Sequence, residues 1–205
     1  MQISLPRAAR LALTVSITLS LLLVIGCARS HQRVDPDVDD GVGGGGTESQ
    51  DVRAMAEMMA RDLLAEAPLD ASAGTPTLHI LALDNSASHP IDKKMVVEMI
   101  RTRLVRHGGG RLRVLNRDAA TLQEIQAERR AKREGAVEGA QKKALLGSDY
   151  VLTGTVRTIS KRGRDSMSSD YWVYSFVVVD LESSEQVWAN EYDFKWAGNK
   201  PAIYR

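Results

Sequence analysis

The chain has 205 residues, with 27 Lys and Arg against 26 Asp and Glu, and its formal net charge is +1. This balance gives no global electrostatic footprint for nucleic acid, so no nucleic-acid partner is predicted. The sequence holds a single cysteine, which excludes an internal disulfide and leaves packing to hold the fold. The length suits one domain with a real hydrophobic core.

The first residues are typical of a secretory leader. Arg7 and Arg10 precede an uncharged apolar run from Leu11 to Ile25. At about 1.5 Å per residue, a helix over this run is shorter than the ~30 Å hydrocarbon core, which disfavours a transmembrane helix. A basic start, an apolar centre and small residues at the end predict a signal peptide over residues 1–26.

The end of the apolar run, Val24-Ile25-Gly26-Cys27, resembles the bacterial lipobox. The resemblance implies cleavage between Gly26 and Cys27, a lipid thioether on Cys27, and acylation of the new N-terminus, with palmitate as the expected chain. A cysteine suits this chemistry because the thiolate is the side-chain nucleophile that accepts the lipid. Several acyl chains make an effectively permanent membrane anchor. Ala28 follows the cysteine instead of Asp, which implies sorting to the outer membrane.

Residues 27–50 combine the lipidated cysteine with acids, a proline and a run of glycines. They show no apolar periodicity, which predicts a disordered tether with a stretched limit of ~80 Å. The globular domain is predicted over residues 51–205.

Helices and strands alternate in the first part of this domain and strands follow in the second. Amphipathic spacing predicts helices, and short β-rich apolar runs predict strands. Three successive strands at the end predict an antiparallel meander. The predicted helices are 51–67, 91–110, 118–134 and 136–147, and the predicted strands are 75–83, 111–116, 148–163, 170–182 and 186–196.

The element order α-β-α-β-α-α-β-β-β defines the predicted fold class. The first two strands are joined by a helix and should be parallel neighbours or near-neighbours, whereas the last three should be antiparallel. We therefore predict an α/β (α+β) fold with a single mixed β-sheet of about five strands and helices packed on it.

No motif in the sequence predicts catalysis, a cofactor or a metal site. His107 to Gly110 has the letters of a lipase oxyanion loop, but it follows a helix and no G-x-S-x-G exists. The phosphate-binding motif G-x-x-x-x-G-K-[ST] is also missing, and the four histidines lack the spacing of a zinc site. We predict a protein that is not an enzyme.

Basic residues cluster at two places in the sequence. One cluster comprises Arg129, Arg130, Lys132 and Arg133, together with Lys142 and Lys143. The other lies at the first predicted hairpin and has aromatic residues across from it. Both can be solvated faces, or they can dock on an acidic protein surface or an anionic cell-wall polymer. Arg with Tyr and Trp is typical of interface hot spots, so the predicted partner-binding residues are Arg162, Arg164, Tyr171, Trp172 and Tyr174.

Three stretches resemble the penicillin-binding protein activator LpoB family and the related CsgG-type lipoproteins. Gly147–Gly154 reads GSDYVLTG and is similar to the family's G-A-D-Y-[LV]-[LV]-x-G strand, with Ser148 in place of Ala. Tyr171–Val187 resembles the family's meander, and Leu78–Ser86 resembles its first strand and Asn-bearing loop.

The resemblance implies a non-catalytic outer-membrane lipoprotein whose domain faces the periplasm. It implies binding and activation of a bifunctional penicillin-binding protein, a peptidoglycan synthase, by contact. The alternative is a CsgG-like oligomeric lipoprotein with a structural or secretion-associated role. The sequence leaves the oligomeric state open.

Overall fold

The structure is a computed structural model that describes residues 33–38, 46–72, 74–139, 144–164 and 167–199. The helices and strands that the structure describes lie in the compact unit that begins at Pro36. The predicted signal peptide, Gly26 and Cys27 fall outside the described residues. Of the helices that are described, none is both long and apolar enough to cross a membrane.

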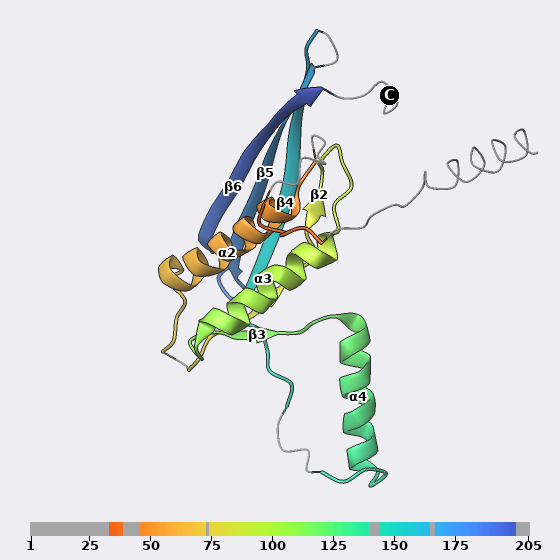
Figure 1. Cartoon of the computed structure of the whole chain (residues 1–205). Coiled ribbons are helices and arrows are strands. Elements are labelled where there is room, and N and C mark those ends of the chain that lie inside the picture. Colours follow the sequence, from red (N-terminus) through yellow and green to blue (C-terminus); the bar gives the residue numbers. More distant parts are fainter. Residues whose placement is uncertain (1–32, 39–45, 73, 140–143, 165–166, 200–205) are drawn as a thin grey trace, which may run out of the picture. The chain divides into compact units, whose positions relative to one another are not determined.

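Three helices and six strands make up the described part of the domain (Figure 1). In chain order they are α2 (Ser49–Glu66), β1 (Thr77–Ile80), β2 (Asp84–Asn85), α3 (Lys93–Gly108), β3 (Arg113–Leu115), α4 (Ala119–Arg133), β4 (Tyr150–Arg162), β5 (Met167–Asp180) and β6 (Gln186–Asn199).

The strands form one mixed sheet in the order β3-β1-β4-β5-β6, with β2 paired to β4. Strand β1 is parallel to both β3 and β4, and β4, β5 and β6 are antiparallel neighbours. The predicted fold class, the parallel first pair and the C-terminal meander are therefore confirmed. The sheet gains a sixth strand because the two-residue β2 lies in a stretch that reads as a loop.

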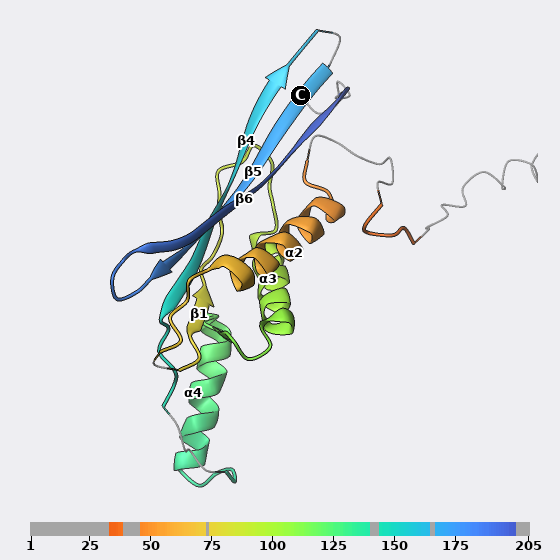
Figure 2. The ribbon, with the colours of Figure 1, turned by 90° about the vertical axis from the view of Figure 1, so that its left-hand side faces the viewer.

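Helices α2 and α3 cover one face of the sheet (Figure 2). Side chains alternate along a strand, so every second residue of β5 points at these helices. Trp172, Tyr174, Phe176 and Val178 are all buried there. They pack against one side of α2 and one side of α3, whose core residues are Met55, Met59, Leu63, Val96, Ile100 and Leu104.

Two of the predicted helices differ notably from the structure. Helix α2 begins two residues earlier than predicted, because Glu48 and Asp51 form a reciprocal capping box that starts the helix at Ser49. The predicted helix over 136–147 is wrong in the part that the structure describes, 136–139 and 144–147. Gly135 and Gly139 have φ of 75° and 131°, a region that continues no right-handed helix.

Candidate interaction surface

The signature stretch Gly147–Gly154 joins two parallel strands. Asp149 Oδ2 accepts hydrogen bonds from the Thr77 backbone N–H and the Thr77 hydroxyl, each at 2.8 Å. The Asp149 N–H in turn donates to the Thr77 hydroxyl oxygen at 2.9 Å. The aspartate therefore locks the start of β4 to the start of β1, which are 72 residues apart.

The neighbouring signature residues are structural as well. The buried Tyr150 hydroxyl accepts a hydrogen bond of 2.9 Å from the Asp70 N–H. Ser148 donates to the Tyr150 carbonyl at 2.9 Å and lies 3.0 Å from His79 Nδ1. Burial lowers the pKa of His79, since the ring is partly shielded from water. Ser148, where the family pattern has Ala, thus adds a polar link between β4 and β1.

Gly154, the last residue of the signature, lies close to the core side chains of Phe176 and Leu83. A Cβ built on this glycine would lie 2.6 Å from the Phe176 ring and 2.9 Å from a Leu83 methyl group. Any larger residue must displace one of these core side chains. The signature is therefore explained by packing and hydrogen bonding, and it does not mark a reactive site.

The aromatic residues predicted for partner binding fall on opposite faces of β5. Trp172 and Tyr174 have no exposed surface and lie under the helices. Burial raises the pKa of the Tyr174 hydroxyl, which lies 2.8 Å from the Thr47 hydroxyl oxygen. Both residues are predicted to bind a partner, but the strand alternation turns their side chains into the core and away from the surface.

Tyr171 lies on the other, open face of the sheet. Its hydroxyl donates a 2.8 Å hydrogen bond to Asp193 on β6. This bond is the main reason why the pKa of Tyr171 is raised. Across the sheet, Tyr171 pairs with Ile159, which is 60% exposed, and with Lys195.

The basic residues of the hairpin also divide between the two faces. Arg157 pairs with Val173 and Lys161 with Ser169, so both share the open face with Tyr171. Arg162 pairs with Ser168 and follows the other alternation, while Arg164 lies in the turn. All four basic residues are exposed. We name the exposed Arg157, Ile159 and Lys161, together with the half-buried Tyr171, the hairpin patch.

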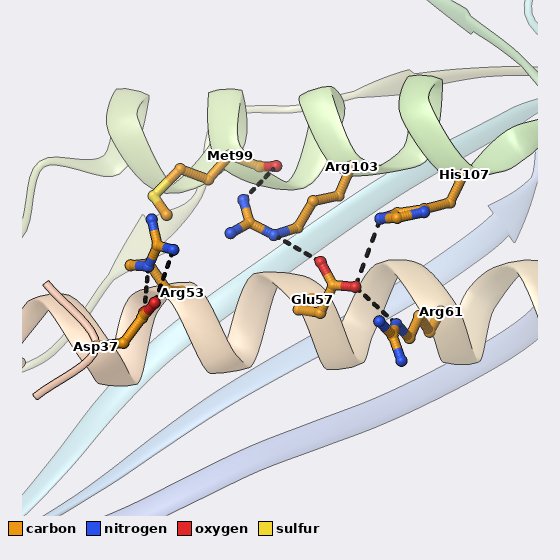
Figure 3. Close-up of polar contacts among 7 residues, drawn as sticks. All are labelled: Asp37, Arg53, Glu57, Arg61, Met99, Arg103 and His107. Carbon is orange, nitrogen blue, oxygen red and sulfur yellow. Dashed lines mark hydrogen bonds and ion pairs between the residues drawn. The ribbon is translucent and has the colours of Figure 1, made fainter.

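Polar contacts of Glu57 link α2 to α3, and we name this group of contacts the α2–α3 seam. It was not predicted from the sequence. Figure 3 shows Glu57 of α2 pointing toward α3. Its carboxylate accepts hydrogen bonds from Arg61 at 2.6 Å and Arg103 at 3.1 Å, and lies 3.4 Å from His107 Nε2. The hydrogen bond from Arg61 is the largest cause of a lowered pKa at Glu57. The i,i+4 spacing of Glu57 and Arg61 was readable, but the α3 partners required the tertiary structure.

The same seam extends to the segment before α2. Arg53 of α2 forms an ion pair with Asp37, and its Nη2 donates to Asp37 Oδ2 at 3.0 Å (Figure 3). The hydrogen bond from Arg53 lowers the pKa of Asp37. Ser49 donates to the Pro36 carbonyl at 2.8 Å. Residues before the helix therefore contact the domain near the start of α2.

The hollow beside the end of α2 offers little for chemistry. A hollow of about 440 Å³ lies between the end of α2 and the start of β3, and its lining is mostly aliphatic with Arg111 as the one charged residue. Within the described ranges, no group of three His, Cys, Asp or Glu residues could hold a metal ion.

These features define a class of protein: an α+β domain with one face of its sheet covered by helices and the other left open. The family follows from comparison of the whole chain. A model described as "Peptidoglycan-synthase activator LpoB" matches residues 51–194, well over half of the chain. The protein belongs to the LpoB family, and the resemblance seen in the sequence is confirmed. Membership implies a regulatory role toward peptidoglycan synthases.

Solved structures with a similar arrangement include two LpoB C-terminal domains. The one from Salmonella enterica is 15% identical, with a TM-score of 0.41, covering 73% of this chain and 99% of that one. The one from Escherichia coli is 13% identical, with a TM-score of 0.42, covering 70% and 98%. The PelC dodecamer from Paraburkholderia phytofirmans is 19% identical, with a TM-score of 0.32, covering 64% and 77%.

A search among curated proteins finds no match. The family match gives no support to the CsgG-like oligomeric alternative.

Proposed function

We propose that this protein is a lipoprotein, anchored in the outer membrane through Cys27, that binds and activates a bifunctional penicillin-binding protein. The observation that carries the proposal is the LpoB family match over residues 51–194. The lipobox-like sequence ending at Cys27 supports the anchor, and Ala28 supports sorting to the outer membrane. The domain then faces the periplasm, where the synthase works.

We propose further that the synthase docks on the hairpin end of β4 and β5. The hairpin patch combines two cations, an aromatic side chain and an exposed aliphatic one. This mixture suits an acidic partner surface with an apolar centre. Arg162 and Arg164 add exposed positive charge at the tip of the same hairpin. Trp172 and Tyr174 support the hairpin from inside the core and make no direct contact.

The anchor is tested by feeding cells an alkyne-tagged palmitate and separating inner and outer membranes on a density gradient. The wild-type chain should carry the label and sediment with the outer membrane. The Cys27→Ala chain should carry none. Label on the Cys27→Ala chain, or wild-type chain in the inner membrane, would contradict this part of the proposal.

The interface is tested by charge reversal with a matched control. Arg162→Glu with Arg164→Glu should weaken binding to the purified synthase at least about tenfold, as expected for charges at a complementary interface. Arg130→Glu with Arg133→Glu makes the same change in net charge on α4, where both residues are exposed. Equal losses in the two double variants would leave the hairpin without a specific role.

Activation is measured separately from binding, as the rate of glycan synthesis by the same synthase with and without the lipoprotein. A rate that the wild-type chain does not raise, despite binding, would remove the activator role. Loss of both binding and stimulation in the hairpin variant, with the α4 control unaffected, is the expected result.

A further inference from the structure

Strand β6 forms one edge of the sheet and pairs with no second strand among the described residues. It has 14 residues, which is long for an edge strand. Proteins commonly protect such edges with prolines, bulges or very short strands. The pairing with β5 has one irregularity, opposite Val178 and Val179, and is regular from Trp188 to Asn199. This part of β6 contains no proline, so every residue keeps the backbone N–H that a neighbouring strand would need.

The edge is held in place from the helix layer. The Trp188 indole donates to Asp62 at 2.9 Å, and the Trp196 indole donates to Asp51 at 3.2 Å. Both carboxylates belong to α2, so the two ends of the regular stretch are fixed to the same helix. A strand that is already extended and fixed loses little conformational freedom when it pairs.

Two rows of side chains run along this edge. The row on the helix side contains Tyr192, Phe194 and Trp196, which are only partly buried. Phe194 lies 6.1 Å from the Tyr192 ring and 6.1 Å from the Trp172 ring, measured between centroids. The aromatic side chains of β6 therefore pack at the rim of the core and keep part of their surface accessible.

The row on the open face carries charges. Glu191 and Asp193 are exposed carboxylates, and Lys195 is an exposed ammonium. Lys195 has no carboxylate within ion-pair distance in the part of the chain that the structure describes. The order of signs along the strand is minus, minus, plus.

We propose that β6 is a self-association edge, on which β6 of a second copy of this chain pairs antiparallel about Phe194. A two-fold axis perpendicular to the sheet brings two edge strands together antiparallel and keeps equal faces on the same side. The residue on the axis then fixes every cross-strand pair. The helices of both copies lie on one side of a continuous sheet, and the charged rows lie on the other.

The charges select this register from its neighbours. With Phe194 on the axis, Asp193 of each copy lies opposite Lys195 of the other, which gives two opposite-charge pairs. With Asp193 on the axis, two Glu191–Lys195 pairs form, but the two copies of Asp193 face each other. With Lys195 on the axis, the two copies of Lys195 face each other and no opposite-charge pair forms. With Tyr192 on the axis, Glu191 lies opposite Asp193 twice. Only the Phe194 axis gives two opposite-charge pairs and no like-charge pair. Like charges directly opposite destabilise a sheet, and opposite charges stabilise it.

In the same register, the aromatic side chains of the two copies also pair with each other. Phe194 of one copy lies opposite Phe194 of the other, and Tyr192 lies opposite Trp196 in both directions. Aromatic cross-strand pairs are among the stabilising ones. Charge and aromatic pairing therefore favour one and the same axis, although they lie on different faces. This inference does not depend on the synthase proposal.

Cysteine cross-linking of the full chain in its own membrane tests the register. Two differently tagged copies are produced together, one with Asp193→Cys and the other with Lys195→Cys, and a mild oxidant is added. The mixed pair should form a disulfide-linked dimer in clearly higher yield than either variant with itself. A wild-type pair controls for Cys27. Equal yields for all pairs, or no dimer in any, would overturn the proposal.

A charge swap tests the energetics while leaving the aromatic row of β6 intact. Lys195→Asp should weaken self-association of the detergent-solubilised full chain at least about tenfold, because each opposite-charge pair becomes a like-charge pair. Adding Asp193→Lys to that variant restores both pairs with reversed sign and should restore the dimer. The melting temperature of each variant verifies folding.

Sedimentation of the wild-type chain and both variants decides the outcome. A wild-type monomer at all concentrations, or a double variant no better than Lys195→Asp, would overturn the proposal. A cross-link from residue 193 to a different protein in place of a second copy would also overturn self-association, and would assign the edge to strand addition by a partner.

Discussion

The two faces of strand β5 differ in what their side chains do, although their sequences are similarly apolar. The residues that point to the helices, from Trp172 to Val178, form the centre of the core. The residues between them, from Tyr171 to Val179, lie on the open face and keep part of their surface accessible. A shift of one position along the strand therefore separates residues that stabilise the domain from residues that can contact another molecule.

The largest effect on stability is expected from a comparison of two adjacent aromatic residues, one on each face of β5. Trp172→Ala should lower the free energy of unfolding by about 3–5 kcal/mol, because it leaves a cavity in the core. Tyr171→Ala should lower it by less than about 1 kcal/mol, since its ring lies on the open face. Urea denaturation measures both. Similar losses would mean that the open face carries as much of the stability as the covered one.

The second test concerns close packing on the covered side. Gly154→Ala should lower the free energy of unfolding by about 1–3 kcal/mol, because the new methyl group overlaps the Phe176 ring. Gly147→Ala is the matched control in the same signature, where a Cβ meets no atom within 4 Å. Thermal unfolding of the two variants should differ clearly, and equal melting temperatures would refute the packing explanation of Gly154.

The third test concerns the polar end of the signature. Asp149→Ala removes the acceptor of two hydrogen bonds from Thr77 and should lower the free energy of unfolding by about 1–2 kcal/mol. Asp149→Asn keeps an acceptor oxygen and should lose less than half of that amount. If Asn is as destabilising as Ala, charge and not hydrogen bonding is the property that matters there.

The smallest effect is expected at the seam outside the sheet. Glu57→Gln should lower the free energy of unfolding by about 0.5–1 kcal/mol at neutral pH, a range typical of partly exposed ion pairs. The pKa of Glu57 is lowered in the folded state, so the unfolded state binds its proton more readily. The stabilisation is therefore complete above the ordinary pKa of 4.5 and is lost as the pH falls through the folded-state pKa. A wild-type and variant difference that persists unchanged in acid would contradict this.

The sequence predicted the fold class because its strongest patterns are local. The meander from β4 to β6 shows long β-rich runs with short turns, and α2 and α3 show clear apolar spacing. The helix predicted over 136–147 is missing from its described residues because Gly135 and Gly139 have positive φ, which does not continue a right-handed helix. The two-residue β2 has no sequence signal, since it is defined by its pairing with Thr155 and Val156.

The interaction surface was less predictable for a physical reason. In β5 both faces are apolar, so composition could not decide which of Tyr171 and Trp172 is exposed. That choice depends on the helices, and α2 and α3 lie far from β5 in the sequence. The α2–α3 seam escaped detection for the same reason, because Arg103 and His107 meet Glu57 only after the helices pack.

The position of β1 in the sheet has a consequence for the timing of folding. It lies between β3 and β4, and its contact with Asp149 joins residues 72 positions apart. Contacts between distant parts of a chain form slowly, because a long loop must close first. The sheet cannot be completed until the C-terminal third of the chain has been made. For the exported lipoprotein that we propose, this order would favour translocation in an unfolded state.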